Sequence, residues 1–161
     1  MERNTHITLY TFLKLIVLCF GVIALDQITK HFIMSSMRRG NSISVLGNFF
    51  RIGYIHNSGG VFGTNLGGNL FYILAAIFAA GILIIWLLQK RHMPIGLLGI
   101  ALMLGGAIGN LWDRVTVKAV IDFLDFGIGR TRWPTFNVAD AAITTGIILL
   151  IIQELLSPRD E

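Results

Sequence analysis

The chain has 161 residues, of which 54% are hydrophobic and only 14% are charged, and it carries a formal net charge of +4. About 25% of the residues of a soluble domain are charged, so this composition excludes an ordinary soluble domain and indicates a membrane protein. The basic residues are scattered among predicted loops, which argues against binding to nucleic acid and favours contact with anionic membrane lipids.

Four segments are apolar over roughly the 20 residues that a helix needs to cross a hydrocarbon core of about 30 Å. They run from residues 11 to 30, 70 to 88, 94 to 112 and 138 to 156. We expect the first to be a retained helix and not a signal peptide, because its apolar stretch is long and no small-residue cleavage pattern follows it. We therefore predict an all-α membrane bundle of four transmembrane helices, with residues 1–161 forming a single integral membrane domain.

The connections between these segments are unequal in length. Residues 31–69 and 113–137 form two long connections on one side, whereas the turn at Lys90 and Arg91 on the other side is very short. Basic residues in short loops mark the cytoplasmic side, so this turn favours cytoplasmic termini. A bare count of basic residues favours the opposite orientation, but the rule is weaker for long loops. We expect the long connections to form the working face outside.

The two long connections carry strand-like patterns. The first contains SISVLGNFFRIGYIHNSGGVFG, where apolar and aromatic residues alternate loosely between glycines. This pattern predicts a few short strands with tight turns, and hence a small β-rich platform at the outer membrane surface. The second contains VIDFLDFGIG, whose apolar spacing suits a short amphipathic helix or an interfacial strand, and Trp133 suits the headgroup level.

Polar residues gather at the outer ends of the four predicted helices. The inner ends show only ordinary terminal charges such as Glu154. Coincidence is one explanation, because polar residues must lie outside the apolar core somewhere. The crowding nevertheless favours a site made of four aspartates, three asparagines and two cations, namely Asp26, Lys30, Asn57, Asn110, Asp113, Arg114, Asp122, Asn137 and Asp140.

Several of these charged residues have a simpler structural interpretation. Asp26 and Lys30 are spaced i and i+4, so an ion pair that orders a helix end is favoured over a catalytic couple. Asp113 and Arg114 can together clamp a loop to a helix through paired hydrogen bonds. Asp125, in a plausible amphipathic stretch, can belong to a solvated face.

The remaining neutral residues also have structural alternatives. Asn57 and Asn110 can satisfy loop carbonyls, and His56 lacks a second histidine at a ligand spacing, so we expect it at the surface or in packing. Cys19 is the only cysteine, which excludes an internal disulfide and a cysteine-based metal cluster. It lies in the middle of the first helix, where we expect a packing role.

Asp122 and Asp140 have no evident cationic neighbour in the sequence. The structural alternative for Asp140 is that a carboxylate in the first turn of a helix is stabilised by the helix dipole, by about 0.3–1 kcal/mol. Neither residue accompanies a Ser, His or Cys arranged for nucleophilic catalysis, and no His/Cys cluster suggests zinc. Two carboxylates brought together would share a proton, so that one could activate water while the other protonates a substrate carbonyl.

Five motifs resemble those of the lipoprotein signal peptidase family, also called signal peptidase II, which comprises membrane aspartyl proteases that remove the signal peptide of bacterial prolipoproteins. In chain order they are LDQITK, HNSGGVFG, GNLWDRV, AVIDFLDF and FNVADAAI, and the resemblance covers essentially the whole chain. It implies that Asp122 and Asp140 are catalytic. It also implies supporting roles for the polar residues Asp26, Lys30, Asn57, Asn110, Arg114 and Asn137.

The resemblance further implies a multi-pass enzyme of the bacterial inner membrane that acts as a monomer, with its active site toward the outer face. The substrate would be a prolipoprotein whose cysteine bears a diacylglyceryl group, cleaved just before that cysteine, and no metal or organic cofactor is implied. Two positions depart from the family pattern. Gly60-Val61 replaces the more common pair of alanines, and Lys118 stands where glycine is common.

Two other classes of protein are alternatives. A proton-coupled carrier would also have intramembrane acids and a lysine. However, no acid lies at the midplane of a predicted helix, and no paired Gly/Pro interruptions occur. A scaffold could use the same ion pairs to order helix ends, and would tolerate replacement of Asp122 and Asp140 by asparagine, whereas a peptidase would not.

Overall fold

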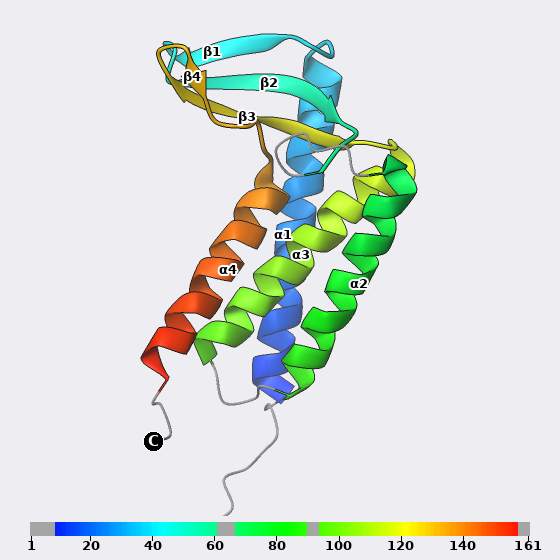
Figure 1. The fold of residues 1–161 in the computed structure, drawn as a ribbon, viewed down its shortest axis with the longest axis vertical. Coiled ribbons are helices and arrows are strands. Elements are labelled where there is room, and N and C mark those ends of the chain that lie inside the picture. The colour runs from blue at the N-terminus through cyan, green and yellow to red at the C-terminus, as the bar shows by residue number, and fades with distance from the viewer. Residues whose placement is uncertain (1–8, 61–66, 90–93, 158–161) are drawn as a thin grey trace, which may run out of the picture.

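The computed structural model describes residues 9–60, 67–89 and 94–157. These residues form an elongated helical bundle with a small sheet at one end (Figure 1). The helices are α1 (Leu9–Ser36), α2 (Gly68–Gln89), α3 (Pro94–Thr116) and α4 (Val138–Leu156). Each is long and apolar enough to cross a membrane, which confirms the predicted four-helix membrane bundle. The turn at Lys90 and Arg91, and Val61 of HNSGGVFG, lie outside the described residues.

Two helices extend beyond their predicted ends. α1 continues from Lys30 to Ser36, and α3 continues from Trp112 to Thr116. The prediction was wrong at these ends because the apolar run stops before the backbone hydrogen bonding does. α1 terminates only where Met37 donates its N–H to the Ile33 carbonyl and the chain turns at Gly40, whose φ is +86°. As a result, the polar end of GNLWDR is helical and does not belong to a loop.

α3 occupies the centre of the bundle and packs against α1, α2 and α4. Glycines allow α3 and α4 to approach with their backbones in contact. A Cβ atom on Gly99 would lie 2.7 Å from the Gly146 carbonyl oxygen, and one on Gly106 would overlap the Ala139 carbonyl oxygen. Small residues at helix crossings permit this close packing in membranes. The start of α4 is thereby held against the end of α3.

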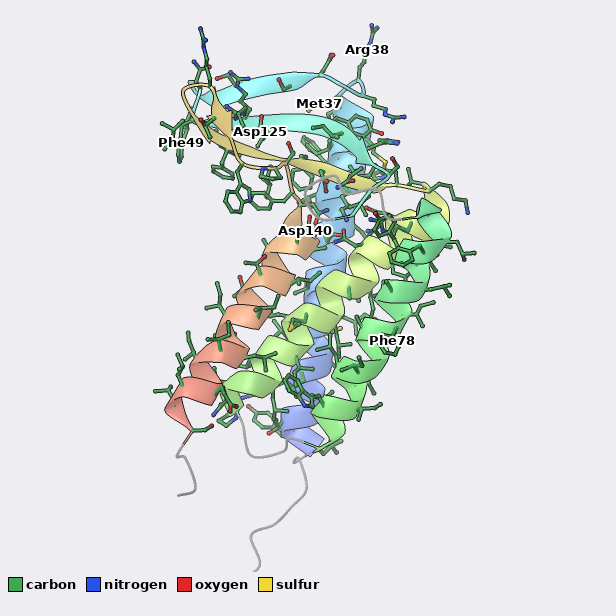
Figure 2. All side chains as sticks on the ribbon, in the orientation of Figure 1. Met37, Arg38, Phe49, Phe78, Asp125 and Asp140 are labelled. Atoms are coloured by element: carbon green, nitrogen blue, oxygen red, sulfur yellow. The ribbon has the colours of Figure 1, made fainter. Side chains whose placement is uncertain are left out.

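The apolar core of the bundle lies between α1, α2 and α3. Leu83, Ile100 and Leu104 form one buried cluster, and the half-buried Cys19 packs against it. This confirms the predicted packing role of Cys19. Many other apolar side chains on the bundle face outward, as Phe78 does in Figure 2, which suits helices surrounded by lipid.

The sheet is formed by β1 (Ser42–Leu46), β2 (Phe50–Asn57), β3 (Val120–Ile128) and β4 (Thr131–Arg132). All neighbouring strands are antiparallel, in the order β1-β2-β3-β4. The short strands predicted for the first long connection are confirmed, and VIDFLDFGIG forms β3 and not a helix. The sheet therefore joins the two long connections, since β2 comes from one and β3 from the other.

Candidate active site

The predicted polar residues converge where the sheet meets the bundle. Figure 2 shows Asp140 at the end of α4 that faces the sheet, with Asp125 within the sheet itself. Asp26, Lys30, Asp113, Arg114, Asp122 and Asn137 are all buried, although each is polar or charged. Buried polar groups are stable only when they are paired, so each of these side chains requires partners.

Asp122 is placed by the pairing of β3 with its two neighbours. On one side, β2 sets Ile55 opposite Asp122 and ends at Asn57. On the other side, the chain leading into α4 pairs with β3, since the Leu124 N–H donates to the Phe136 carbonyl at 2.8 Å. Both neighbours supply an amide donor, because Nδ2 of Asn57 lies 3.0 Å from Oδ2 of Asp122 and Nδ2 of Asn137 lies 2.8 Å from Oδ1.

Asp140 lies in the first turn of α4 and takes part in a reciprocal capping box. The Asp140 N–H donates to Oδ1 of Asn137 at 2.9 Å, and the Asn137 N–H donates to Oδ2 of Asp140 at 3.3 Å. The helix-end interpretation of Asp140 is therefore correct but incomplete. Its other oxygen, Oδ1, accepts a 2.8 Å hydrogen bond from Nδ2 of Asn110 on α3.

Neutral amides hold both carboxyl groups. Among the described residues, none of the ion pairs includes Asp122 or Asp140. Burial, and next the negative charge of Asp140, raise the pKa of Asp122 to about 7. The two carboxyls can therefore retain one proton between them up to near neutral pH, as acid–base catalysis by a pair of carboxyls requires.

A buried ion cluster lies beside the two carboxyls. Nζ of Lys30 lies 2.7 Å from Oδ2 of Asp26 and 2.8 Å from Oδ2 of Asp113. The predicted pair of Asp26 and Lys30 is thus confirmed. Asp113 and Arg114 do not share a partner, because neighbouring residues on a helix point in directions about 100° apart and Asp113 faces α1. Lys30 also donates to Oδ1 of Asn110 at 3.0 Å.

Arg114 holds a different segment. Its Nη2 donates to the Gly59 carbonyl at 2.6 Å, and its guanidinium lies 4.5 Å from the centre of the Tyr72 ring. Nδ2 of Asn69 donates to the Arg114 carbonyl at 2.8 Å. Arg114 therefore clamps a loop to a helix, as predicted, but the loop is the segment after β2 and the partner is a carbonyl.

Three structural interpretations from the sequence can be compared with the contacts. Asp125 is not simply solvated, because it accepts a 2.6 Å ion-paired hydrogen bond from Nε of Arg132, which links β3 to β4. Among the residues that the structure describes, the amides of Asn57 and Asn110 donate to carboxylates and to no loop carbonyl. His56 is half-buried with Nε2 2.9 Å from the Tyr54 hydroxyl, in agreement with a packing role.

The sequence reasoning missed Gln27. Its Nε2 lies 2.9 Å from Oδ1 of Asp113 and 3.2 Å from both Oδ2 of Asp26 and the Gly109 carbonyl oxygen. Gln27 thus links α1 to α3 at the ion cluster. A polar side chain inside an apolar span is costly and usually functional, and this signal could have identified it.

Comparison with known proteins gives a consistent result. Residues 18–156 match the sequence profile of the signal peptidase (SPase) II family. A protein of Bacillus pumilus (strain SAFR-032) named lipoprotein signal peptidase is 44% identical over 147 residues, which are 89% of this chain and 93% of that protein. A protein of Syntrophus aciditrophicus (strain SB) with the same name is 38% identical, over 87% of this chain and 91% of that protein.

Two solved structures have the same fold. Each is a bacterial membrane enzyme whose structure was obtained by the in meso method, one at 2.3 Å and the other at 1.9 Å resolution. The first has a TM-score of 0.84 and 29% identity over 99% of both chains. The second has a TM-score of 0.80 and 31% identity over 99% of this chain and 100% of that one. Since the family profile and the curated relatives both match over most of its length, the chain belongs to the signal peptidase II family of membrane proteases.

Proposed function

We propose that this chain is an aspartic endopeptidase that removes the signal peptide of prolipoproteins, cleaving just before a cysteine that bears a diacylglyceryl group. Membership of the signal peptidase II family and the names of its relatives support this substrate class. The observation that carries the mechanism is that one asparagine, Asn137, hydrogen-bonds both Asp122 and Asp140, while no cation pairs with either among the described residues.

The proposed reaction uses the single proton that the two carboxyls share. The ionised carboxylate takes a proton from water as the water oxygen attacks the scissile carbonyl carbon, and the protonated carboxyl donates its proton to the carbonyl oxygen. This gives a neutral tetrahedral diol. Its collapse breaks the C–N bond, with one proton passing to the leaving nitrogen and one returning to the pair. The products are the free amino group of the lipidated cysteine and the carboxyl terminus of the signal peptide.

The remaining predicted residues have supporting roles in this proposal. Asn57, Asn110 and Asn137 orient the two carboxyls through the amide hydrogen bonds described above. Asp26 and Lys30 order the end of α1, and Arg114 holds the segment at Gly59 near the pair. Since one chain supplies both carboxyls, we propose that a monomer, acting as a single membrane domain, is sufficient for activity.

The position of the pair suits a lipid-anchored substrate. Asp140 lies at the start of a helix that can span the membrane, so the proposed site is at the level of the membrane boundary. Acyl chains keep a lipidated cysteine at that level, because each buried CH₂ contributes about 0.8 kcal/mol. We place the sheet and the site on the outer side of the bacterial inner membrane, with both termini in the cytoplasm.

The test compares the unmodified chain with Asp122→Asn and Asp140→Asn on a purified diacylglyceryl-modified prolipoprotein. Asparagine keeps the shape of aspartate but cannot exchange a proton near neutral pH, so each variant should lose about 10²–10⁴-fold in turnover. Asp125→Asn, on the same strand as Asp122 but paired with Arg132, is the matched control and should cleave normally. Cleavage is followed by gel mobility, and mass spectrometry of the product identifies the bond broken.

Three results would contradict the proposal. Substantial cleavage by Asp122→Asn or Asp140→Asn would show that the carboxyl in question is structural, as in a scaffold. A product that does not begin at the lipidated cysteine would exclude the proposed bond. Equal cleavage of lipidated and unlipidated precursor would exclude recognition of the diacylglyceryl group.

A further inference from the structure

Two buried carboxylates each hold the backbone immediately before a proposed catalytic aspartate. Oδ1 of Asp26 accepts a 2.9 Å hydrogen bond from the backbone N–H of Ala139, the residue before Asp140. Oδ2 of Asp113 accepts a 3.1 Å hydrogen bond from the backbone N–H of Ile121, the residue before Asp122. The same kind of anchor therefore occurs once on α4 and once on β3, although the two carboxylates come from α1 and α3.

Lys30 joins the two anchors into one unit. Its ammonium contacts Oδ2 of both Asp26 and Asp113, and the side chains of the three residues are at most 4% exposed. Its third contact is Oδ1 of Asn110, whose Nδ2 donates to Asp140. Gln27 adds a 2.9 Å hydrogen bond to the free oxygen, Oδ1, of Asp113.

The cluster leaves little room for movement. A Cβ atom on Gly109 would lie only 2.7 Å from Oδ2 of Asp26, so the backbone of α3 packs directly against this carboxylate. Charges at this depth are stable only while they are paired, which favours one fixed arrangement. The anchored N–H groups belong to Ala139 and Ile121, so the cluster restricts the backbone one residue before each proposed catalytic aspartate.

We propose that Asp26 and Asp113 are a matched pair of positioning residues that, joined by Lys30, set the separation of the Asp122 and Asp140 carboxyls. This inference rests on the proposed function, because the separation matters only if the two carboxyls act together. Two carboxyls share a proton only at short range. A misplacement of about 1 Å caused by a distant change can cost about 10²-fold in rate.

The test compares two substitutions at Asp113. Asp113→Asn keeps an oxygen for the Ile121 N–H and for Lys30, and loses only the hydrogen bond from Gln27, whose Nε2 still donates to Asp26 and to the Gly109 carbonyl. Asp113→Ala removes the anchor. We expect Asp113→Ala to lose about 10²-fold in kcat with little change in KM, and Asp113→Asn to retain most of kcat. Asp125→Ala, which removes the ion pair with Arg132 elsewhere on β3, should leave kcat and the pH profile unchanged.

A second readout does not depend on cleavage. Among the described residues, the charged groups that act on Asp122 include Asp140 from α4, Lys30 from α1 and Arg114 from α3, and β2 contributes the neutral Asn57. Burial and the charge of Asp140 both raise the pKa of Asp122, and Lys30 lowers it. Removing the Asp113 anchor should weaken both effects that raise the Asp122 pKa. Lys30 would also lose one of the two carboxylates with which it pairs, so its charge should lower the Asp122 pKa more strongly. Titration of the ¹³C-labelled Asp122 carboxyl, assigned by its absence in Asp122→Asn, should therefore give a lower pKa in Asp113→Ala.

Defined outcomes would overturn the inference. One is a kcat of Asp113→Ala close to that of the unmodified chain, and another is an equal loss of kcat in the alanine and asparagine variants. An unchanged Asp122 titration in Asp113→Ala, or the same changes in Asp125→Ala, would also overturn it. If Asp113→Ala does not fold, the comparison of Asp26→Asn with Asp26→Ala tests the other anchor, through Ala139. Failure of the proposed function is distinct, because it would appear as an unmodified chain that does not cleave or an Asp122→Asn variant that does.

Discussion

The side-chain amide of Asn137 donates a 2.8 Å hydrogen bond to Oδ1 of Asp122. Asn137 is also the N-cap of α4, and its backbone N–H donates to Oδ2 of Asp140. One residue thus holds two carboxyls that come from a strand and a helix. Because Asn137 is completely buried, its hydrogen bonds are protected from competition with water.

Substitution of Asn137 separates its two roles. Asn137→Ser keeps an oxygen for the cap but removes the donor to Asp122, whereas Asn137→Ala removes both. Both variants should lose kcat to a similar extent, about 10-fold, because both lose the hydrogen bond that orients the Asp122 carboxyl, and a typical hydrogen bond contributes about 0.5–1.5 kcal/mol. Only the alanine variant should also lose the N-cap hydrogen bond, which should lower its free energy of unfolding by about 1 kcal/mol. Kinetics on lipidated substrate and thermal unfolding in detergent check this, and a fully active Asn137→Ser would contradict it.

The raised pKa of Asp122 gives a prediction for stability against pH. In the unfolded chain this carboxyl ionises near its ordinary value of about 4, whereas in the folded chain it holds its proton to about pH 7. The folded state binds the extra proton, so the stabilisation is complete below pH ~4 and is lost as pH rises through about 7. The slope between these values is at most about 1.4 kcal/mol per pH unit.

Asp122→Asn provides the comparison for this pH dependence. The variant has no proton to lose at this position, so its thermal midpoint should fall less than that of the unmodified chain between pH 5 and about 7.5. Cleavage by the unmodified chain should also decrease as the shared proton is lost above about pH 7. Parallel stability curves for the two proteins would show that Asp122 is ionised in the folded chain throughout this range.

Hydropathy was sufficient to predict the parts of the fold that depend on the membrane. The four spans follow from unbroken apolar runs, and the two long connections identified the end of the bundle where polar residues meet. Asp122 and Asp140 could be selected because neither has a cationic neighbour in sequence. The described residues agree on this point, since none of their ion pairs includes either carboxyl, and the catalytic role of the two aspartates stays a prediction.

The partners of the other polar residues could not be predicted in this way. Asp113 pairs with Lys30 because of the rotation of α3 against α1, which depends on which glycines allow close contact. The meeting of Asn57 with Asp122 depends on the register between β2 and β3, which shifts at an irregularity between Ile52 and Ile55. A one-residue change of register would turn each strand side chain to the opposite face of the sheet, and the sequence pattern does not fix this.

Lys118 gives a prediction about backbone strain. Its φ is +65°, in the left-handed region where a side chain is costly and glycine is not. Lys118→Gly should therefore raise stability by up to about 1 kcal/mol, after the greater entropy of glycine in the unfolded chain is subtracted. Lys118→Ala is the matched control, since it loses the same contact to the Val115 carbonyl but keeps the strain. A thermal midpoint that rises equally in both variants would show that the strain is not the cause.

Orientation in the membrane can be tested by thiol labelling in a Cys19→Ala background. Ser44 and Thr131 are exposed on the sheet, and Ser157 follows α4 at the opposite end of the bundle. If the sheet lies outside, Ser44→Cys and Thr131→Cys should react with a membrane-impermeant maleimide added to intact cells. Ser157→Cys should react only after permeabilisation, and a cysteine in the turn at residues 90–92 should behave in the same way.

The labelling result also bears on the substrate. A diacylglyceryl-modified cysteine is held at the membrane boundary by its acyl chains, so the side on which Asp122 and Asp140 lie decides whether a translocated precursor can reach them. Reaction of Ser157→Cys in intact cells, with protection of Ser44→Cys, would place the pair on the cytoplasmic side. Cleavage would then have to precede export of the lipoprotein, because a carboxyl pair fixed at the inner boundary could not reach a peptide bond at the outer one.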